Sequence, residues 1–325
     1  MKVNLFGNIY KNKFLKKGLE LAADNGALFV AGTSLALSTV ARPIAIYSTP
    51  KTDKENRKLA CAKSIASSSV GFGLMLGVSL PVSDNIKKIN DSPQSYLKPE
   101  TIKNLKDAGK ALVQSSAYKF STQLIKLGLG AVMAIPKAVV TCALIPPVMS
   151  FFFKDKKMTA DSGSKPKNIQ KNLTFMGNPA KASIAKELAK IINNKSVQNF
   201  SNKYKDTNYP MHIAAITDTV ATGAFMVQTK KNKNIEEKRK NVLMNNAAIS
   251  TGLCIVSSYA VDKALDKPTK KFIENFKKAN KKSPKLDKYI EGIKIAKPAL
   301  IMGSIYYCAI PVVSTFFAER FGKRS

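Results

Sequence analysis

The sequence predicts an all-α, polytopic helical membrane protein with about six hydrophobic helices, arranged as two related three-helix repeats with basic amphipathic connecting helices. Three observations carry this prediction. Six long apolar stretches alternate with lysine-rich connectors, several motifs recur in the same order in the two halves, and two connectors have the spacing of amphipathic helices. The 325 residues are 45% apolar, which is enough for a folded interior.

The six apolar stretches have roughly the length that a bilayer demands. A hydrocarbon core about 30 Å thick needs roughly 20 mostly apolar helical residues. The stretches are rich in Ala, Leu, Ile and Val and lack the alternation of half-buried strands, so we expect helices. They cover residues 27–48, 59–82, 124–153, 209–229, 242–262 and 295–318. Each also holds polar residues, and the mean hydropathy of the chain is only −0.11. A soluble or surface-bound helical bundle is therefore the alternative.

The two halves share marks in the same order, which indicates an internal duplication. A constant offset of 182 residues carries Asp24 to Asp206, and each of these precedes the first apolar stretch of its half. Further matches are Asn4–Asn8 with Asn172–Asn178, Lys51 with Lys233, Glu55-x-Arg57-Lys58 with Glu237-x-Arg239-Lys240, Lys98-Pro99 with Lys267-Pro268, and Pro147–Phe153 with Pro311–Phe317. We expect repeats at residues 1–165 and 166–325 within one integrated membrane domain.

Three crossings per repeat would place the second repeat upside down relative to the first, as in many transporters whose sites lie between repeats. An alternative is that the third stretch of each repeat is re-entrant, because prolines interrupt it at Pro136, Pro146, Pro147 and Pro311. The cations are nearly balanced between the two sets of connectors, so the charge distribution predicts no orientation.

The charge and the cysteines restrict the partners. Lys and Arg number 53 against 21 Asp and Glu, a net charge of +32, which favours anionic lipid headgroups or an acidic partner. Nucleic acid is less expected, since the aromatic residues lie apart from the lysine runs. The four cysteines stand in separate apolar stretches, and His212 is the one histidine. We therefore expect no metal site, no cofactor and no enzymatic activity.

Ionisable residues inside the apolar stretches are the candidates for a substrate-binding or gating site, because such groups are expensive in hydrocarbon. Arg42 lies near the end of the first stretch and Asp218 lies within the fourth, at depths that would allow them to pair. Lys137 lies in the middle of the third stretch, beside Pro136. A purely structural ion pair is the alternative for Arg42 and Asp218.

Small and amide side chains indicate where helices meet. Ser69, Gly73 and Gly77 are spaced four residues apart, which favours close helix packing, and Asn245 and Asn246 are able to bond between helices. The connectors Pro179–Phe200 and Leu265–Lys278 combine apolar residues at helical spacing with a lysine-rich face. We expect them to lie on an anionic membrane surface, with ordinary solvated bundle helices as the alternative.

These features favour a non-enzymatic, multi-pass membrane protein, with a weak preference for a bacterial inner membrane. One hypothesis is permeation or binding of a small solute or ion at the repeat interface. The alternative is a structural or membrane-associated scaffold whose lysine-rich connectors bind anionic lipid or an acidic partner. A homo-oligomer is compatible with both hypotheses.

Overall fold

The described part of the protein is entirely helical. The computed structural model describes residues 9–48, 54–153, 181–232 and 237–313, and these residues form helices joined by short loops, with no β-strand among them. The all-α prediction is therefore confirmed.

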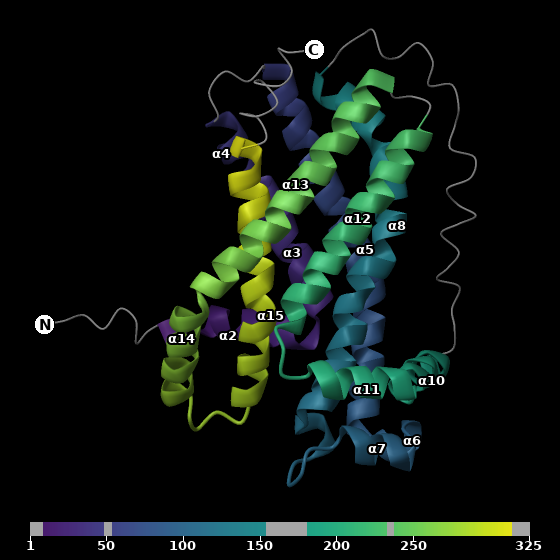
Figure 1. The fold of residues 1–325 in the computed structure, drawn as a ribbon, viewed down its shortest axis with the longest axis vertical. Coiled ribbons are helices and arrows are strands. Elements are labelled where there is room, and N and C mark those ends of the chain that lie inside the picture. The colour runs from purple at the N-terminus through teal and green to yellow at the C-terminus, as the bar shows by residue number, and fades with distance from the viewer. Residues whose placement is uncertain (1–8, 49–53, 154–180, 233–236, 314–325) are drawn as a thin grey trace, which may run out of the picture.

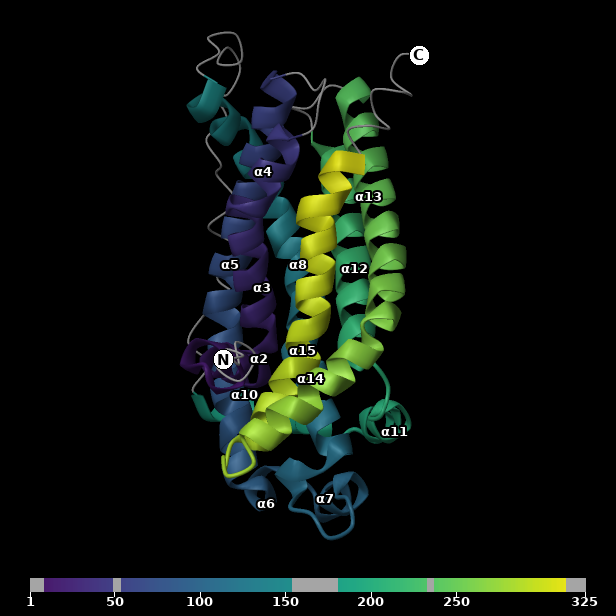
Figure 2. The same cartoon turned by 90° about the vertical axis from the view of Figure 1, so that its left-hand side faces the viewer.

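Six long helical segments form a closed ring and make up the body of the molecule (Figures 1 and 2). Each contacts its two neighbours in the order α3, α5, α8, α12, α13, α15 and back to α3, and α3 also contacts α8 while α12 also contacts α15. A short helix, α4, continues α3, and a single π-helical turn, η3, continues α15. The bounds are Gly26–Thr39 for α3, Ala41–Tyr47 for α4, Lys54–Asp91 for α5, Ser116–Phe153 for α8, Tyr209–Lys231 for α12, Glu237–Ala264 for α13, Leu286–Ser304 for α15 and Ile305–Ala309 for η3.

Four of these segments are long and apolar enough to cross a membrane. They are Gly26–Tyr47, Ser64–Asp91, Ser116–Leu144 and Leu286–Val313. The prediction of six such segments is thus met only in part. Helices α12 and α13 are long enough, at 23 and 28 residues. However, α12 contains His212 and Asp218 and α13 contains Asn245 and Asn246, and these side chains lower the mean hydropathy of both helices.

The outer surface of the ring is apolar. We took the most apolar 18-residue window of each span. Only 11%, 17% and 28% of this window is buried inside the molecule in the first three spans, and 50% in the fourth. Large side chains on the other helices also point outward, among them Ile216 and Val256, which are 59% and 70% exposed. We call this surface the apolar belt. Exposure of this belt to water would cost a free energy of roughly 25 cal/mol for each Å² of apolar surface.

Short helices gather at one end of the ring and form what we call the base (Figures 1 and 2). They are α2 (Lys13–Asp24), α6 (Pro93–Tyr96), α7 (Pro99–Leu105), η1 (Leu112–Gln114), α10 (Lys181–Ile192), α11 (Lys195–Tyr204) and α14 (Asp266–Ala279). The expected connector helices therefore form, but their apolar faces pack on protein. Ile192 of α10 and Phe276 of α14 are completely buried, in two separate hydrophobic clusters of the base.

The contact between α2 and α15 depends on Gly292. A Cβ atom at this position would overlap the backbone carbonyl of Leu19 in α2. The absence of a side chain lets the two helices touch at the backbone, so Leu19 reaches the buried cluster around Tyr289 and Ile293.

The two halves of the ring run in the same direction. Helices α3 and α12 both rise from the base, α5 and α13 both descend, and α8 and α15 both rise (Figures 1 and 2). The expected inversion of the second half does not occur in this arrangement. Nor is the third stretch re-entrant within the described residues, because α8 is one continuous helix through Pro136 and the helical chain continues through η3 beyond α15.

This common direction predicts which positions share a side of the membrane. Ser48, at the end of α4, and Lys231, at the end of α12, are exposed residues at the end of the ring far from the base. We expect Ser48→Cys and Lys231→Cys to react with an impermeant maleimide from one side. Lys103→Cys in α7 and Lys271→Cys in α14 should react from the other. The four native cysteines would first be replaced by serine. Labelling of positions 48 and 231 from opposite sides would establish the inverted arrangement instead.

Candidate functional site

Lys137 of α8 and Asp218 of α12 lie on helices that pack together, close enough for their charges to act on each other. The Lys137 side chain lies over Gly71 of α5, where an added Cβ would be 3.0 Å from Lys137 Cε and 3.1 Å from Nζ. Two turns earlier in α8, Gly130 faces Thr217, the neighbour of Asp218. A Cβ atom added at Gly130 would lie 3.0 Å from Thr217 Cγ2. Glycines therefore bring three helices close around the two charges.

Asp218 also faces the fifth helix of the ring. Its charge acts on the thiol of Cys254 in α13, and Cys254 Sγ lies 3.6 Å from the backbone carbonyl oxygen of Met302 in α15. Asp218 thus sits on the inner side of α12, between α8 and α13.

Arg42 belongs to a different cluster. Its guanidinium lies 5.4 Å from the ring centroid of Tyr306 and 6.0 Å from that of Tyr307, both in η3. The hydroxyl of Tyr307 lies 3.2 Å from Ser68 Oγ of α5. Arg42 Nε is buried and has no hydrogen-bond partner. The structure therefore does not bring Arg42 to Asp218, whose charged neighbour is Lys137.

The three predicted site residues thus occupy two contacts between the halves of the ring. Lys137 and Asp218 lie where the third segment of the first half, α8, meets the first segment of the second half, α12. Arg42 lies where the first segment of the first half meets the third segment of the second, at η3. The two clusters occupy corresponding positions in the order of helices, but their chemistry differs.

The residues predicted to lie at helix contacts are exposed, and other residues form those contacts. Ser69, Gly73 and Gly77 lie on an exposed face of α5, and an added Cβ at Gly73 would meet nothing within 4 Å. The packed face of the same helix carries the small buried residues Ser64, Ser68, Gly71 and Ser79. Asn245 and Asn246 are exposed as well, and Asn246 accepts a hydrogen bond from Ser250 of its own helix.

The corner between α2 and α3 is fixed by polar side chains from other helices, which the sequence does not reveal. Gln123 Nε2 and Lys126 Nζ of α8 donate to the carbonyl oxygen of Ala23, at 2.8 and 3.2 Å. Ser83 of α5 donates to the carbonyl oxygen of Asp24 at 3.0 Å. The last carbonyls of a helix lack intrahelical partners, so these bonds allow the chain to turn from the base into the ring.

The base carries a large excess of positive charge. Residues 9–24, 83–116, 181–208 and 262–291 contain 26 lysines and 13 aspartates and glutamates. Several of the carboxylates already have partners, as in Glu20 with Lys285 and Asp24 with Lys288. The backbone N–H of Ser116, followed by Lys205, lowers the pKa of Asp107. The unpaired lysines point outward, most densely on α14 and the loop after it.

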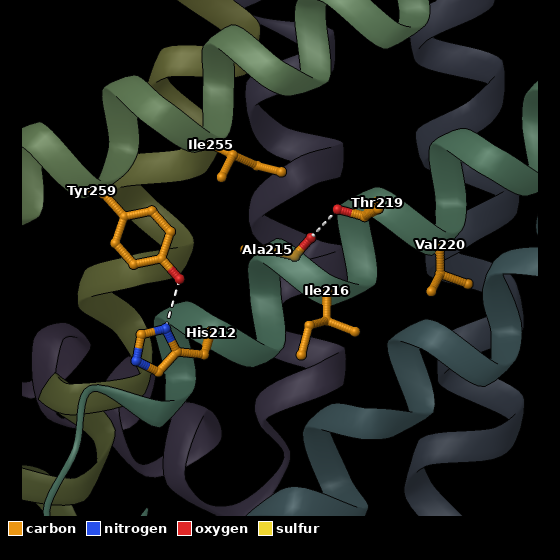
Figure 3. Close-up of a pocket in the computed structure, with 7 residues that line it drawn as sticks. All are labelled: His212, Ala215, Ile216, Thr219, Val220, Ile255 and Tyr259. Carbon is orange, nitrogen blue, oxygen red and sulfur yellow. Dashed lines mark hydrogen bonds between the residues drawn. The ribbon is translucent and has the colours of Figure 1, made fainter.

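An apolar groove of about 420 Å³ lies on the outer side of α12 and α13 (Figure 3). Ile216, Val220 and Ile255 form its walls. At its end towards the base, His212 Nδ1 and the Tyr259 hydroxyl are 2.6 Å apart. The groove belongs to the apolar belt, and Tyr259 was not among the residues that the sequence singled out.

The described residues hold no group of three or more His, Cys, Asp or Glu side chains able to bind a metal ion. Cys61, Cys142, Cys254 and Cys308 are free thiols. Comparison with known proteins gives no match: no protein-family model, no curated protein and no solved structure resembles the chain significantly.

The charges of Lys137 and Asp218 predict a pattern in a double-mutant cycle. Lys137→Met and Asp218→Asn should each lower the free energy of unfolding by about 1–3 kcal/mol, because each removes the opposite charge that acts on the remaining ionised group. The double variant should recover most of this loss. Thermal unfolding in detergent micelles measures all three, with Lys230→Met at the exposed end of α12 as the control. Additive effects of the two changes would show that the charges do not stabilise each other.

Proposed function

We propose that the protein is a non-enzymatic, membrane-embedded scaffold whose basic base lies on anionic lipid headgroups. One observation carries the proposal: an apolar belt around the ring adjoins a base with 13 more lysines than acidic residues. Hydrocarbon solvates the first surface, and the negative potential of an anionic leaflet attracts the second.

The base offers charges that are not already used inside the protein. Helix α14 presents Lys267, Lys270, Lys271, Lys277 and Lys278 as exposed residues, while Phe276 anchors the opposite face of the helix in the interior. A buried anchor holds the lysines at a fixed height relative to the ring. This placement favours an ordered lipid-facing surface, since fixed side chains lose less entropy on binding.

The finer architecture that we propose is a pair of parallel three-helix repeats related by an axis along the ring. Asn12 and Asn194 stand 182 residues apart, and each caps a base helix, α2 and α11, by accepting backbone N–H bonds. The helix contacts support the same relation. Helix α2 packs on α15 and α11 packs on α8, so in each repeat the base helix just before the first ring segment packs on the third segment of the other.

Parallel repeats constrain the segment of chain that links them. Residues 154–180 lie outside the described residues, but they connect the far end of α8 to the base, where α10 begins. This stretch contains six lysines and two aspartates, a composition that hydrocarbon does not accept without protein around it. In a bilayer, the proposal therefore requires this chain or a second copy to shield the link from lipid.

A second candidate function is binding or permeation of an ion or small solute at a contact between the halves. The convergence of Lys137 and Asp218 from α8 and α12 favours it, because charged side chains inside a membrane protein often mark a solute pathway. Arg42 would not line the same site, since its neighbours are in η3.

The scaffold proposal predicts a difference between two matched lysine pairs. Lys277 and Lys278 end α14 in the base, and Lys230 and Lys231 end α12 at the far end of the ring. We expect Lys277→Gln/Lys278→Gln to reduce the preference for anionic over zwitterionic lipid by about fivefold per lysine at low salt, from about 1 kcal/mol each. Spin-labelled phosphatidylglycerol and phosphatidylcholine in reconstituted membranes measure this preference.

The control is Lys230→Gln/Lys231→Gln, which removes the same charge from the same position in a helix. It should leave the preference within twofold of the wild-type value. Equal effects of the two double variants would show that only total charge matters, and the base would then have no special role.

A further inference from the structure

We infer that the groove between α12 and α13 is a binding site for one glycerophospholipid, with an acyl chain along the groove and the headgroup oxygens at His212 and Tyr259. The inference rests on the proposed membrane embedding, which supplies the lipid. It goes beyond that proposal because it assigns one defined lipid site on the ring, on residues that the lysine-rich surface of α14 does not include.

The walls of the groove suit a hydrocarbon chain. Ile216, Val220 and Ile255 line it, and Thr219 turns its hydroxyl towards its own helix, where it donates to the carbonyl oxygen of Ala215 at 2.8 Å (Figure 3). The volume of about 420 Å³ lies within the range of roughly 300–1,000 Å³ that is usual for ligand pockets. The groove is therefore large enough to hold part of a lipid.

The groove fits within one leaflet of a bilayer. Val220 follows His212 by eight residues in α12, or about 12 Å at 1.5 Å per residue. One leaflet contributes about 15 Å to a hydrocarbon core that is about 30 Å thick. Tyr259 stands at the end of the groove towards the base, and tyrosine is typical of the level of the lipid headgroups. An acyl chain from the leaflet on the base side would therefore lie along the groove.

The polar end of the groove keeps a hydrogen-bond donor for a ligand. His212 Nδ1 and the Tyr259 hydroxyl are 2.6 Å apart, and the second ring nitrogen of His212 points away from Tyr259 (Figure 3). A neutral histidine carries one N–H and a tyrosine one O–H. Their mutual bond uses one of these protons in either tautomer, so the other is left to donate. Both residues are exposed, so a lipid oxygen is able to accept that bond.

Positive charge borders the same end of the groove. Lys263 is exposed and follows Tyr259 by four residues, which places it on the same face of α13 and one turn closer to the base. His212 lies at the start of α12, where the helix dipole is positive. The charge of Asp262 acts on Tyr259, but Lys297 Nζ compensates it at 2.8 Å from its Oδ1. These charges favour an anionic lipid phosphate at this end.

A phospholipid suits the groove better than a helix of a second copy does. Close packing of membrane helices uses small residues, whereas Ile216, Val220 and Ile255 are large branched side chains. The polar pair of His212 and Tyr259 stands at one end only of the lining. A flexible chain with a single polar end matches both properties.

The test maps lipid contacts on the full chain in vesicles of phosphatidylcholine and phosphatidylglycerol. A phosphatidylglycerol with a photoactivatable group in its acyl chain should label the groove about fivefold more than a matched apolar surface of α8, where Val132 and Ile135 are 68% and 56% exposed. Ile216→Trp, which fills the groove, should lower its labelling to the level of α8. The control, Val132→Trp, should leave the labelling of the groove unchanged.

A second variant tests the polar end. His212→Leu/Tyr259→Phe removes both donors and keeps the apolar walls, so it should lower the labelling of the groove by phosphatidylglycerol about fivefold. Equal labelling of the groove and α8 in the wild type would overturn the inference, because the lipid there would be ordinary solvent. Cross-links between two copies of the chain at the groove would also overturn it and would assign the groove to a second copy.

Failure of the membrane proposal is visible separately. An alkaline wash that releases the chain from the vesicles would contradict membrane embedding. The same photoactivatable lipid, presented in detergent micelles, would then decide the fate of the site. Selective labelling of the groove would keep the site, and uniform labelling of the groove and α8 would overturn it.

Discussion

The fold depends on where its apolar surface is placed. In a water-soluble bundle the apolar stripe of each helix faces the interior, whereas here much of the most apolar sequence faces outward, and at most half of any spanning window is buried. The inner side of the ring is correspondingly rich in small and polar residues, such as Ser68, Gly71 and Thr217. Helices that pack through small residues and solvate their large ones in lipid are typical of membrane proteins.

The base makes this arrangement specific. Its two hydrophobic clusters are built like those of soluble proteins, with completely buried residues such as Ile86, Ile192 and Phe276. The polar corner at Ala23 then fixes how the first ring helix leaves the base. In the proposed membrane embedding, the molecule combines a conventional hydrophobic core outside the lipid with a loosely covered ring inside it.

The sequence predicted the helices well because composition alone specifies them. The long apolar stretches became ring helices, and the amphipathic connectors became α10, α11 and α14. The packed face of α5 was not predictable, because a helix that is apolar on all sides has no periodicity to distinguish Gly71 from Gly73. The sequence likewise did not predict the charged neighbour of Asp218. The position of a residue along its helix restricts pairing to residues at a similar height, and it does not select between Arg42 and Lys137.

The relative direction of the two halves was also beyond the sequence. Repeated motifs predict that two units resemble each other, but the path of residues 154–180 decides whether they run parallel or inverted, and no local pattern there specifies that path. The cation counts were balanced because each half contributes both to the base and to the far end of the ring.

The most direct measurement of the central claim is the behaviour of the full chain in cell membranes washed at alkaline pH. The account predicts that the protein stays in the membrane pellet after carbonate treatment and in high salt, and that only detergent brings it into solution. Release by carbonate into a monodisperse species that needs no surfactant would contradict it, because the apolar belt would then be covered by protein or tolerated in water.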